Sequence, residues 1–325
     1  MKLKPIFRIV GTKTGTSLID ACVLLRGYLH GDLRLVEPFC GSASVSIAVD
    51  AEKCLLADLQ PHAILTLQVL RGKPLGLLAA FDSLRNIFLE NPSSEAFYSI
   101  RDNPPKTAVD RAAWFIFITH AAFNWLWRVN SRGKCNTTFG AEAGIRRVKT
   151  ALDRRNALAL VSWLSSENKE IVLADAFDTI SSCGTGDLIY VDPPYVEQFD
   201  SYTRTKFRNT GHIRLCKALR DAWMRGAQVC LHCNADRKIA ALYTSFCTVM
   251  LRSVRRVVAG SKLAGKGDND WEMLIVSQPQ QATLFPPNRP ENSSWFGGTA
   301  KPVWNEHESL WETWTPLPAF NLSLF

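Results

Sequence analysis

The sequence predicts a mixed α/β fold: a mainly parallel sheet with helices on both faces and an inserted, mostly helical module. Apolar runs of strand length alternate with helical segments, which is typical of a sheet covered by helices. A basic, helical stretch interrupts this alternation, and strand signals resume after it. The 325 residues, 46% of them hydrophobic, suffice for one sizeable core and a smaller insertion.

The first predicted elements form a βαβ unit. Residues 33–39 predict a strand, residues 40–44 a small-residue turn that opens a helix to about Asp50, and residues 54–57 a second strand ending at Asp58. This order is typical of nucleotide-binding units, in which the acid binds ribose hydroxyls. The turn contains one glycine, Gly41, where dinucleotide-binding folds have three.

The later elements suggest how the chain is divided. Residues 75–169 are helical and basic, with a turn-rich segment at 130–136. Strands are predicted at 171–174, 187–191, 229–232, near Val249 and at 273–277, and a helix at 213–224. We therefore expect residues 1–74 and 170–278 to form one domain, and residues 75–169 to form an inserted module. Residues 279–325, with seven of the 16 prolines, are expected to form an extended tail.

The net charge of +8 is concentrated in three blocks. Residues 101–155 hold eleven Lys and Arg against four acids, residues 204–220 six against none, and residues 252–266 five against none. Such blocks are typical of proteins that bind a polyanion, although solvated faces give the same pattern.

Other features bear on location and metal content. No run of about 18 uncharged apolar residues occurs and no signal peptide is evident, so we expect a cytoplasmic protein without membrane contact. Nine cysteines, an odd number without framework spacing, indicate reduced thiols. Cys230 and Cys233 lie in an apolar stretch with no second pair, which favours strand packing over a metal site.

The segment Asp192-Pro193-Pro194-Tyr195 follows an apolar strand, where open α/β sheets hold ligands. A carboxylate and the backbone carbonyl after it can accept both hydrogens of a planar amino group, which orients the nitrogen lone pair toward a methyl donor. The prolines fix φ, and Tyr195 offers a face on which a base can stack. The plain alternative is a proline turn with a capping Asp.

Four shorter motifs precede this tetrapeptide. They are Lys4-Pro5 with Gly11-Thr12-Lys13, then Glu37-Pro38-Phe39-Cys40-Gly41, then Asp58, then Asp175-Ala176-Phe177. In this order they resemble the motifs of the alpha-group amino methyltransferases, the Dam-like (D12 class) family of DNA adenine N6-methyltransferases. The resemblance covers about residues 4–278.

The resemblance implies a Rossmann-like sheet that binds S-adenosylmethionine. Residues 1–74 would form its cofactor-binding part, 75–169 the target-recognition module for double-stranded DNA, and 170–278 the catalytic part, which methylates N6 of a flipped adenine, as in restriction-modification systems. In the family, the lysine at the position of Lys13 meets the cofactor's carboxylate. The implied cofactor-binding residues are Ile9, Lys13, Glu37, Phe39, Gly41, Asp58, Asp175, Phe177 and Asp192. Ile9 and Thr12 depart from a usual tryptophan and glycine.

Residues 124–140 resemble the DNA-contacting hairpin of the family. The implied DNA-binding residues are Asn124, Arg128, Asn130, Arg132 and Asn136. Arg132 falls where the family can read a guanine, but phosphate contacts by Arg128 and Arg132 remain an equal alternative. Trp125 and Thr138 replace a usual glycine and proline, so the common GATC target is not assumed.

The histidines, His120 and His232 among them, are predicted to be packed or exposed rather than catalytic. No carboxylate or cysteine partner lies at a telling spacing from any of them. Asn234 falls where the family has a Ser-Asn pair near the target base, so we expect it in the pocket wall.

Two other functions remain open. One is methylation of a different planar amine, such as cytosine N4, guanine N2 in RNA or a protein glutamine, and the other is a catalytically inactive DNA-binding adaptor. In the tail, Gln281-Ala282-Thr283-Leu284-Phe285 and Asn321-Leu322-Ser323-Leu324-Phe325 resemble peptides that dock on the bacterial sliding clamp. The alternative is that these apolar residues pack on the body of the protein.

Overall fold

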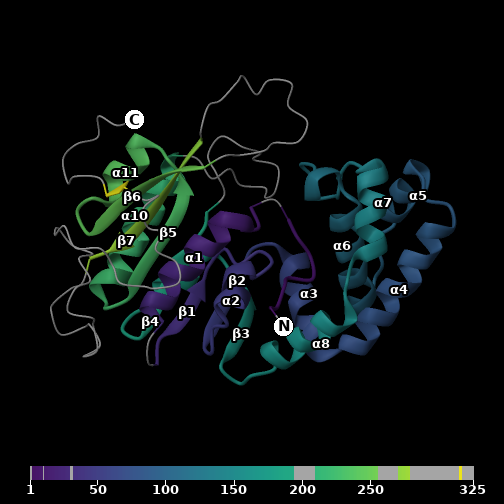
Figure 1. Ribbon diagram of the computed structural model, residues 1–325, viewed down its shortest axis with the longest axis horizontal. Coiled ribbons are helices and arrows are strands. Elements are labelled where there is room, and N and C mark those ends of the chain that lie inside the picture. The colour runs from purple at the N-terminus through teal and green to yellow at the C-terminus, as the bar shows by residue number, and fades with distance from the viewer. Residues whose placement is uncertain are drawn as a thin grey trace. The chain divides into compact units, whose positions relative to one another are not determined.

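The fold is known from a computed structural model that describes residues 2–9, 11–29, 32–193, 209–254, 270–278 and 315–316. Of these, the residues up to 179 fall in one compact unit, and residues 180–193, 209–254, 270–278 and 315–316 fall in a second. Each unit contains strands and helices (Figure 1). The mixed α/β fold expected from the sequence is therefore confirmed.

The first unit contains three parallel strands in the order β3-β2-β1. These are β1 (Arg34–Glu37), β2 (Cys54–Asp58) and β3 (Lys169–Leu173). Helix α1 (Gly15–Tyr28) precedes β1, α2 (Ser44–Val49) joins β1 to β2, α3 (Pro61–Gly72) follows β2, and α9 (Ala176–Ser181) follows β3. The predicted βαβ unit is thus present, and its first strand ends at Glu37 because a turn begins at Pro38.

Five helices and one 3-10 turn lie between α3 and β3. They are α4 (Pro74–Glu90), α5 (Ser94–Asp102), α6 (Ala108–Ala121), η1 (Phe123–Trp125), α7 (Ala141–Thr150) and α8 (Arg154–Leu164). Figure 1 shows α4 to α7 gathered in one helical group, drawn in blue and teal. Helix α6 is its centre, because every residue from 112 to 121 is buried.

Polar residues start these helices by accepting backbone N–H groups that have no partner within the helix. The side chain of Ser93 accepts from the N–H of Ala96 at the start of α5. Thr107 accepts from the N–H of Asp110 at the start of α6. The helical reading of residues 75–169 is confirmed by these elements, apart from the hairpin at 122–139.

An aromatic cluster joins the amino-terminal segment, α3, α6 and the hairpin in the core of the first unit. The Phe115 ring lies 5.2 Å from Phe7 and 4.8 Å from Trp127, measured between ring centres. The His62 ring lies 5.3 Å from that of Trp127. Burial lowers the pKa of His62 to about 4, so its ring is neutral at neutral pH.

The second unit contains strands in the order β4-β5-β7-β6-β8. They are β4 (Asp187–Val191), β5 (Gln228–Asn234), β6 (Cys247–Val254), β7 (Asp270–Ser277) and β8 (Thr315–Pro316), with α10 (Asn209–Met224) and α11 (Arg237–Tyr243) between them. Strands β4 and β5 are parallel, whereas β7 lies antiparallel between β5 and β6. Two residues of the expected tail, Thr315 and Pro316, pair with β6.

Several predicted elements are longer in the structure. The strand expected at 229–232 extends to Asn234, because residues 230–234 pair in register with β7. The helix expected from residue 213 begins at Asn209, and the strand expected from 171 begins at Lys169. In the two strands, pairing with neighbouring strands adds residues that show no strand signal of their own.

Within the described part of the chain, no single helix has the length and apolar composition to span a membrane, though the bent pair α3 and α4 passes that test together. The described residues also contain no group of three or more His, Cys, Asp or Glu that could hold a metal ion. Cys230 and Cys233 are free thiols buried in β5.

Candidate active site

Three acids stand at the carboxyl ends of the three strands of the first unit. Glu37 is the last residue of β1, Asp58 the last of β2, and Asp175 lies two residues beyond β3. Parallel pairing aligns Asp58 with Leu173, and the N–H of Ala174 donates to the Asp58 carbonyl at 3.3 Å. All three acids therefore lie at the edge where α/β sheets hold ligands.

Asp58 holds the glycine turn in place. Its carboxylate accepts hydrogen bonds from the backbone N–H of Gly41 and from that of Gln60, each at 2.8 Å. Burial raises the pKa of Asp58, and these N–H donors act in the opposite direction. A Cβ atom on Gly41 would lie 3.4 Å from the Ile9 side chain, and the φ of 49° at Gly41 favours glycine.

The opening motif lies against this turn. The Thr12 hydroxyl lies 3.2 Å from that of Ser42 and accepts from the N–H of Ile9 at 3.1 Å. Lys13 is buried beside this segment, and Phe39 is half-buried after β1. The structure thus brings together Ile9, Gly41 and Asp58, which are far apart in the sequence.

The two remaining acids also organise local backbone. The buried carboxylate of Glu37 accepts from the N–H of Ser46 at 2.7 Å and from its hydroxyl, which ties β1 to α2. Asp175 accepts from the N–H of Phe177 at 2.8 Å, where α9 begins. Both Asp175 and Phe177 are half-buried.

The tetrapeptide begins directly after β4, a strand that is buried along its whole length. Asp192 is half-buried and Pro193 is buried, while Pro194 and Tyr195 lie outside the described residues. Strand β5 runs parallel to β4 with Leu231 opposite Val191, and it ends at the half-buried Asn234. Asp192 and Asn234 therefore mark the carboxyl ends of neighbouring strands of the second unit.

The expected DNA-contacting hairpin is present, with Val129 bridged to Cys135. The side-chain oxygen of Asn130 accepts from the backbone N–H groups of Arg132 and Lys134, each at 3.0 Å. Gly133 adopts a φ of 76°, which completes the turn. Asn130 therefore shapes this turn, a role that the sequence did not reveal.

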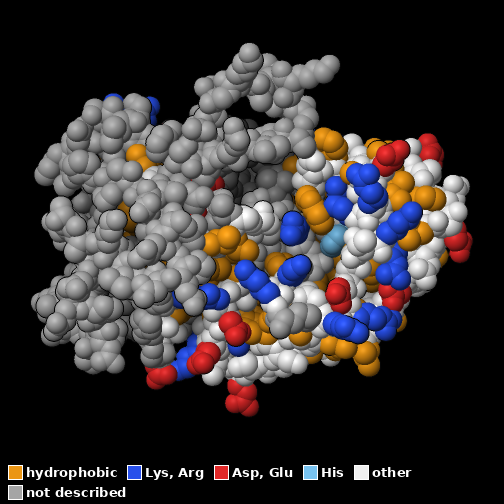
Figure 2. Space-filling model, in the orientation of Figure 1, with side chains coloured by type: hydrophobic (Ala, Val, Ile, Leu, Met, Phe, Trp, Pro, Cys, Tyr) orange, Lys and Arg blue, Asp and Glu red, His pale blue; other side chains and the backbone are white. Residues whose placement is uncertain are grey.

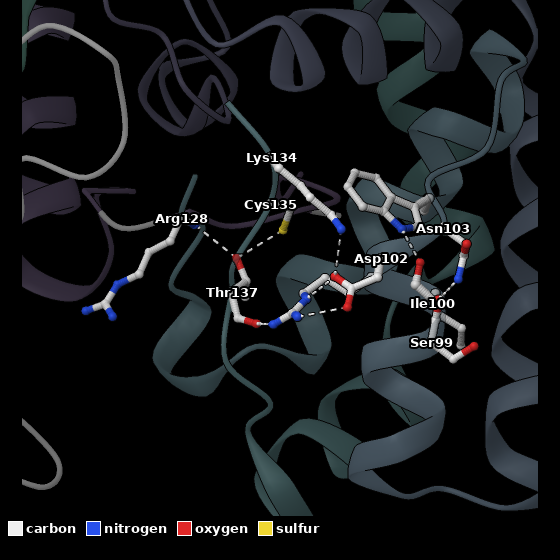
Figure 3. Close-up of polar contacts among 10 residues, drawn as sticks. Ser99, Ile100, Asp102, Asn103, Arg128, Lys134, Cys135 and Thr137 are labelled. Atoms are coloured by element: carbon white, nitrogen blue, oxygen red, sulfur yellow. Dashed lines mark hydrogen bonds and ion pairs between the residues drawn. The ribbon is translucent and has the colours of Figure 1, made fainter. Parts of the chain in front are cut away.

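Thr137 anchors the returning half of the hairpin. Its hydroxyl accepts from the N–H of Arg128 at 3.0 Å, and its carbonyl accepts from Arg101 at 2.9 Å. Figure 3 shows the Arg128 guanidinium pointing away from this network. Asn124, Arg132 and Asn136 are exposed, whereas Arg128 is half-buried.

The turn that precedes the hairpin is held by arginines around Trp125. The guanidinium carbon of Arg147 lies 4.9 Å from the centre of the indole and that of Arg8 lies 5.4 Å from it. Asn124 and Trp125 adopt φ values of 48° and 60°, a conformation costly for residues other than glycine. This contact does not follow from the sequence, in which Trp125 stands out only as a departure from the family's usual glycine.

Basic side chains gather over the described surface of the first unit. Figure 2 shows Lys and Arg, in blue, across the face of this unit that is in view, with hydrophobic side chains between them. The expected basic block of residues 101–155 belongs to this unit. A positive face of this kind attracts a polyanion.

The family model of the D12 class N6 adenine-specific DNA methyltransferases matches residues 25–257. The chain belongs to this family. It is 28% identical over 302 residues to the type II methyltransferase M.MjaIII of Methanocaldococcus jannaschii, covering 85% of this chain and 100% of the relative. It is 26% identical over 282 residues to the retron Ec67 DNA adenine methylase of Escherichia coli, covering 83% and 92%. It also matches a DNA adenine methylase of Vibrio cholerae, at 27% identity over 55% of this chain and 62% of that enzyme.

The predicted function is thereby confirmed: the chain is an adenine-specific DNA methyltransferase, and its substrate is DNA. These matches favour adenine as the methylated base over the other planar amines, and they favour an active enzyme over an inactive adaptor. The roles of individual residues remain predictions.

The methyltransferase also contains a buried polar chain that the sequence reading missed. The Tyr190 hydroxyl lies 3.3 Å from Nδ1 of His232, and Nε2 of His232 lies 3.1 Å from a carboxylate oxygen of Glu272. His232 had been expected to lack a carboxylate partner. Only strand pairing brings Glu272 to it, from 40 residues away.

Proposed function

We propose that this methyltransferase moves the methyl group of S-adenosylmethionine to N6 of a flipped adenine in double-stranded DNA, with Asp192-Pro193-Pro194-Tyr195 holding the adenine. The observation that supports this most strongly is the position of Asp192 directly after the buried strand β4. Asn234 ends the neighbouring parallel strand. A carboxylate and an amide at adjacent strand ends suit an amino group that must be oriented.

The chemistry requires orientation more than a strong base. The adenine amino group is nearly planar, and its lone pair is delocalised into the ring. When Asp192 and the backbone carbonyl of Pro193 accept its two hydrogens, the lone pair turns toward the methyl donor. The nitrogen becomes acidic as it gains the methyl group, so its proton leaves without a strong base.

The residues of the first unit fit S-adenosylmethionine within a Rossmann-like sheet. Asp58 stands where an acid can take ribose hydroxyls, and Gly41 keeps the turn free of a Cβ atom that would contact Ile9. The buried Lys13 would meet the cofactor carboxylate. The proposed set is completed by Ile9, Glu37, Phe39, Asp175, Phe177 and Asp192. When bound, the cofactor supplies an electrophilic methyl group.

Residues 75–169 are proposed to be the target-recognition module. The exposed Asn124, Arg132 and Asn136, with the half-buried Arg128 and Asn130, lie on a hairpin stiffened by its own hydrogen bonds. A stiff hairpin loses little conformational entropy when it enters a DNA groove. Arg128 and Arg132 contact either guanine or phosphates.

Substitution of Asp192 tests the proposal. We expect Asp192→Ala to lower the single-turnover rate of methyl transfer to a DNA duplex by at least about a thousandfold, while the Kd for DNA stays within about threefold. Asp192→Asn, which keeps the shape but replaces one acceptor with a donor, should lie between. An Asp192→Ala enzyme within tenfold of wild type would remove Asp192 from the catalytic role.

Three further measurements separate the alternatives. Mass spectrometry of digested product should show N6-methyladenine and no N4-methylcytosine. Calorimetry should show S-adenosylmethionine binding, which an inactive adaptor would lack. The fluorescence of 2-aminopurine at the target position should rise on binding if the base is flipped.

We also propose that the tail docks on the sliding clamp. The two segments, residues 281–285 and 321–325, lie outside the described residues, and the proposal rests on their Leu-Phe endings alone. Two tethered motifs on one ring would gain avidity. The full chain should bind purified clamp, and alanine at Leu284, Phe285, Leu324 and Phe325 should abolish this binding.

A further inference from the structure

A buried polar chain crosses three neighbouring strands of the second unit. Tyr190 lies on β4, His232 on β5 and Glu272 on β7, and their side chains are joined by the contacts of 3.3 and 3.1 Å. The three residues are 2%, 0% and 4% exposed. The three hydrogen-bonded side chains are therefore enclosed in the core of this unit.

The surroundings of this chain are apolar. On the same face of the sheet, Leu188 precedes Tyr190 by two residues, Cys230 precedes His232 by two, and Leu274 pairs with His232; all three are buried. A buried ionic or polar cluster rarely adds stability over well-packed apolar side chains, because its desolvation offsets its attraction. The presence of three polar groups at this depth therefore calls for a role other than stability.

The position of the chain suggests that role. Within β5, His232 precedes Asn234 by two residues, the strand spacing that places side chains on one face, about 7 Å apart. On β4, Tyr190 lies two residues before Asp192, which directly follows the end of the strand. Glu272 pairs in register with Asn234. Tyr190 and His232 thus lie two residues before Asp192 and Asn234, and Glu272 lies opposite Asn234.

The three groups can form one continuous set of hydrogen bonds. An ionised carboxylate only accepts hydrogen bonds, so Nε2 of His232 donates to Glu272. In a neutral ring Nδ1 then accepts, and the Tyr190 hydroxyl donates to it. These two contacts tie β4 to β5 and β5 to β7 near the ends of β4 and β5.

From this geometry we infer that Tyr190, His232 and Glu272 are positioning residues for methyl transfer: they fix the ends of β4 and β5 and thereby the place of Asp192 relative to Asn234. The inference rests on the proposed role of Asp192. Small displacements at a reacting centre slow a reaction strongly even when binding is unchanged, because the reacting atoms leave their aligned geometry. These three residues therefore affect the methyl-transfer step and not the affinity for DNA or S-adenosylmethionine.

Tyr190→Phe tests this with the loss of one oxygen atom. We expect the single-turnover rate, with DNA and S-adenosylmethionine saturating, to fall about tenfold, while the Kd values for both ligands stay within twofold. Tyr243→Phe is the matched control. Tyr243 is fully buried in α11 of the same unit, and its hydroxyl has no hydrogen-bond partner among the described residues. Its variant should keep the wild-type rate.

Glu272 provides a graded test. Glu272→Gln keeps an acceptor for Nε2 of His232 and should retain more of the rate than Glu272→Leu, by at least about fivefold. The triple variant Tyr190→Phe/His232→Leu/Glu272→Leu removes all the polar groups of this cluster. It should fold with a Tm close to wild type and remain slow, which a purely structural cluster would not produce.

The outcomes separate this inference from the proposed function. Equal rates for Tyr190→Phe and Tyr243→Phe, or an effect confined to Kd, would overturn the positioning role. If Asp192→Ala is inactive while Tyr190→Phe and Glu272→Leu are normal, only the positioning role fails. If Asp192→Ala is active, both fail.

Discussion

Arg147 tests how the hairpin region is held. This α7 side chain reaches back to the end of α6, where Nε donates to the carbonyl of His120 at 2.8 Å and Nη2 donates to the carbonyl of Ala122. The last carbonyls of a helix have no partner within it, and a cation there also interacts favourably with the helix dipole. The guanidinium lies 4.9 Å from the centre of the Trp125 ring as well.

The expected cost of Arg147→Ala follows from these contacts. Hydrogen bonds to a charged group contribute about 1.5–3 kcal/mol each, and the cation–π contact adds about 0.5–1 kcal/mol. Burial, which also lowers the pKa of Arg147, offsets part of this gain, and the half-buried position reduces it further. We expect the free energy of unfolding to fall by about 2–3 kcal/mol.

Urea unfolding followed by circular dichroism measures this loss, with Arg146→Ala as the control. Arg146 is the next residue on α7 and is exposed, so its removal changes the charge equally but should cost under about 0.5 kcal/mol. Because Arg147 also contacts Trp125 in the strained turn, its variant should bind DNA more weakly than Arg146→Ala does. Equal unfolding midpoints for the two variants would refute this reasoning.

Three other predictions concern packing, pH and the cofactor. A Cβ on Gly144 would lie 2.4 Å from the Ala121 carbonyl oxygen, so Gly144→Ala should lower the free energy of unfolding by about 1–3 kcal/mol. Gly76→Ala is the control, because its Cβ would lie at an ordinary 3.6 Å from the Val109 side chain and should not destabilise the protein. Burial lowers the pKa of His120 from 6.5 to about 4, so its contribution to stability is complete above pH 6.5 and is lost as the pH falls toward 4. The free energy of unfolding should therefore fall between pH 7 and 5, and less steeply in His120→Asn; equal slopes would contradict this. Asp58→Ala should raise the calorimetric Kd for S-adenosylmethionine at least about tenfold, and an unchanged Kd would exclude Asp58 from the cofactor site.

Much of the candidate site could be located from local sequence patterns. Asp58 and Asp192 each follow a short apolar run, and such a run between turn residues predicts a strand from its own composition. Gly41 marks a tight turn because its φ of 49° is unfavourable for other residues. These positions are set by neighbours in the chain, so a linear reading finds them.

The hairpin shows where such a reading becomes incomplete. Its turn was identified from residues 130–136, but the hydrogen bonds of Asn130 to the backbone of Arg132 and Lys134 appear only in three dimensions. Arg147 was one of many basic residues in a charged block. Its contacts with α6 and Trp125 depend on how α7 packs, and no local pattern encodes them.

The sequence by itself thus determined the alternation of strands and helices, the acids at strand ends and the family-like motifs, because each depends on residues a few positions apart. The tertiary structure alone decided that β7 lies between β5 and β6 and that Tyr190, His232 and Glu272 meet. His232 is separated from these partners by 42 and 40 residues. Strand order and register bring such residues together, and these are set by burial of the whole sheet rather than by any short segment.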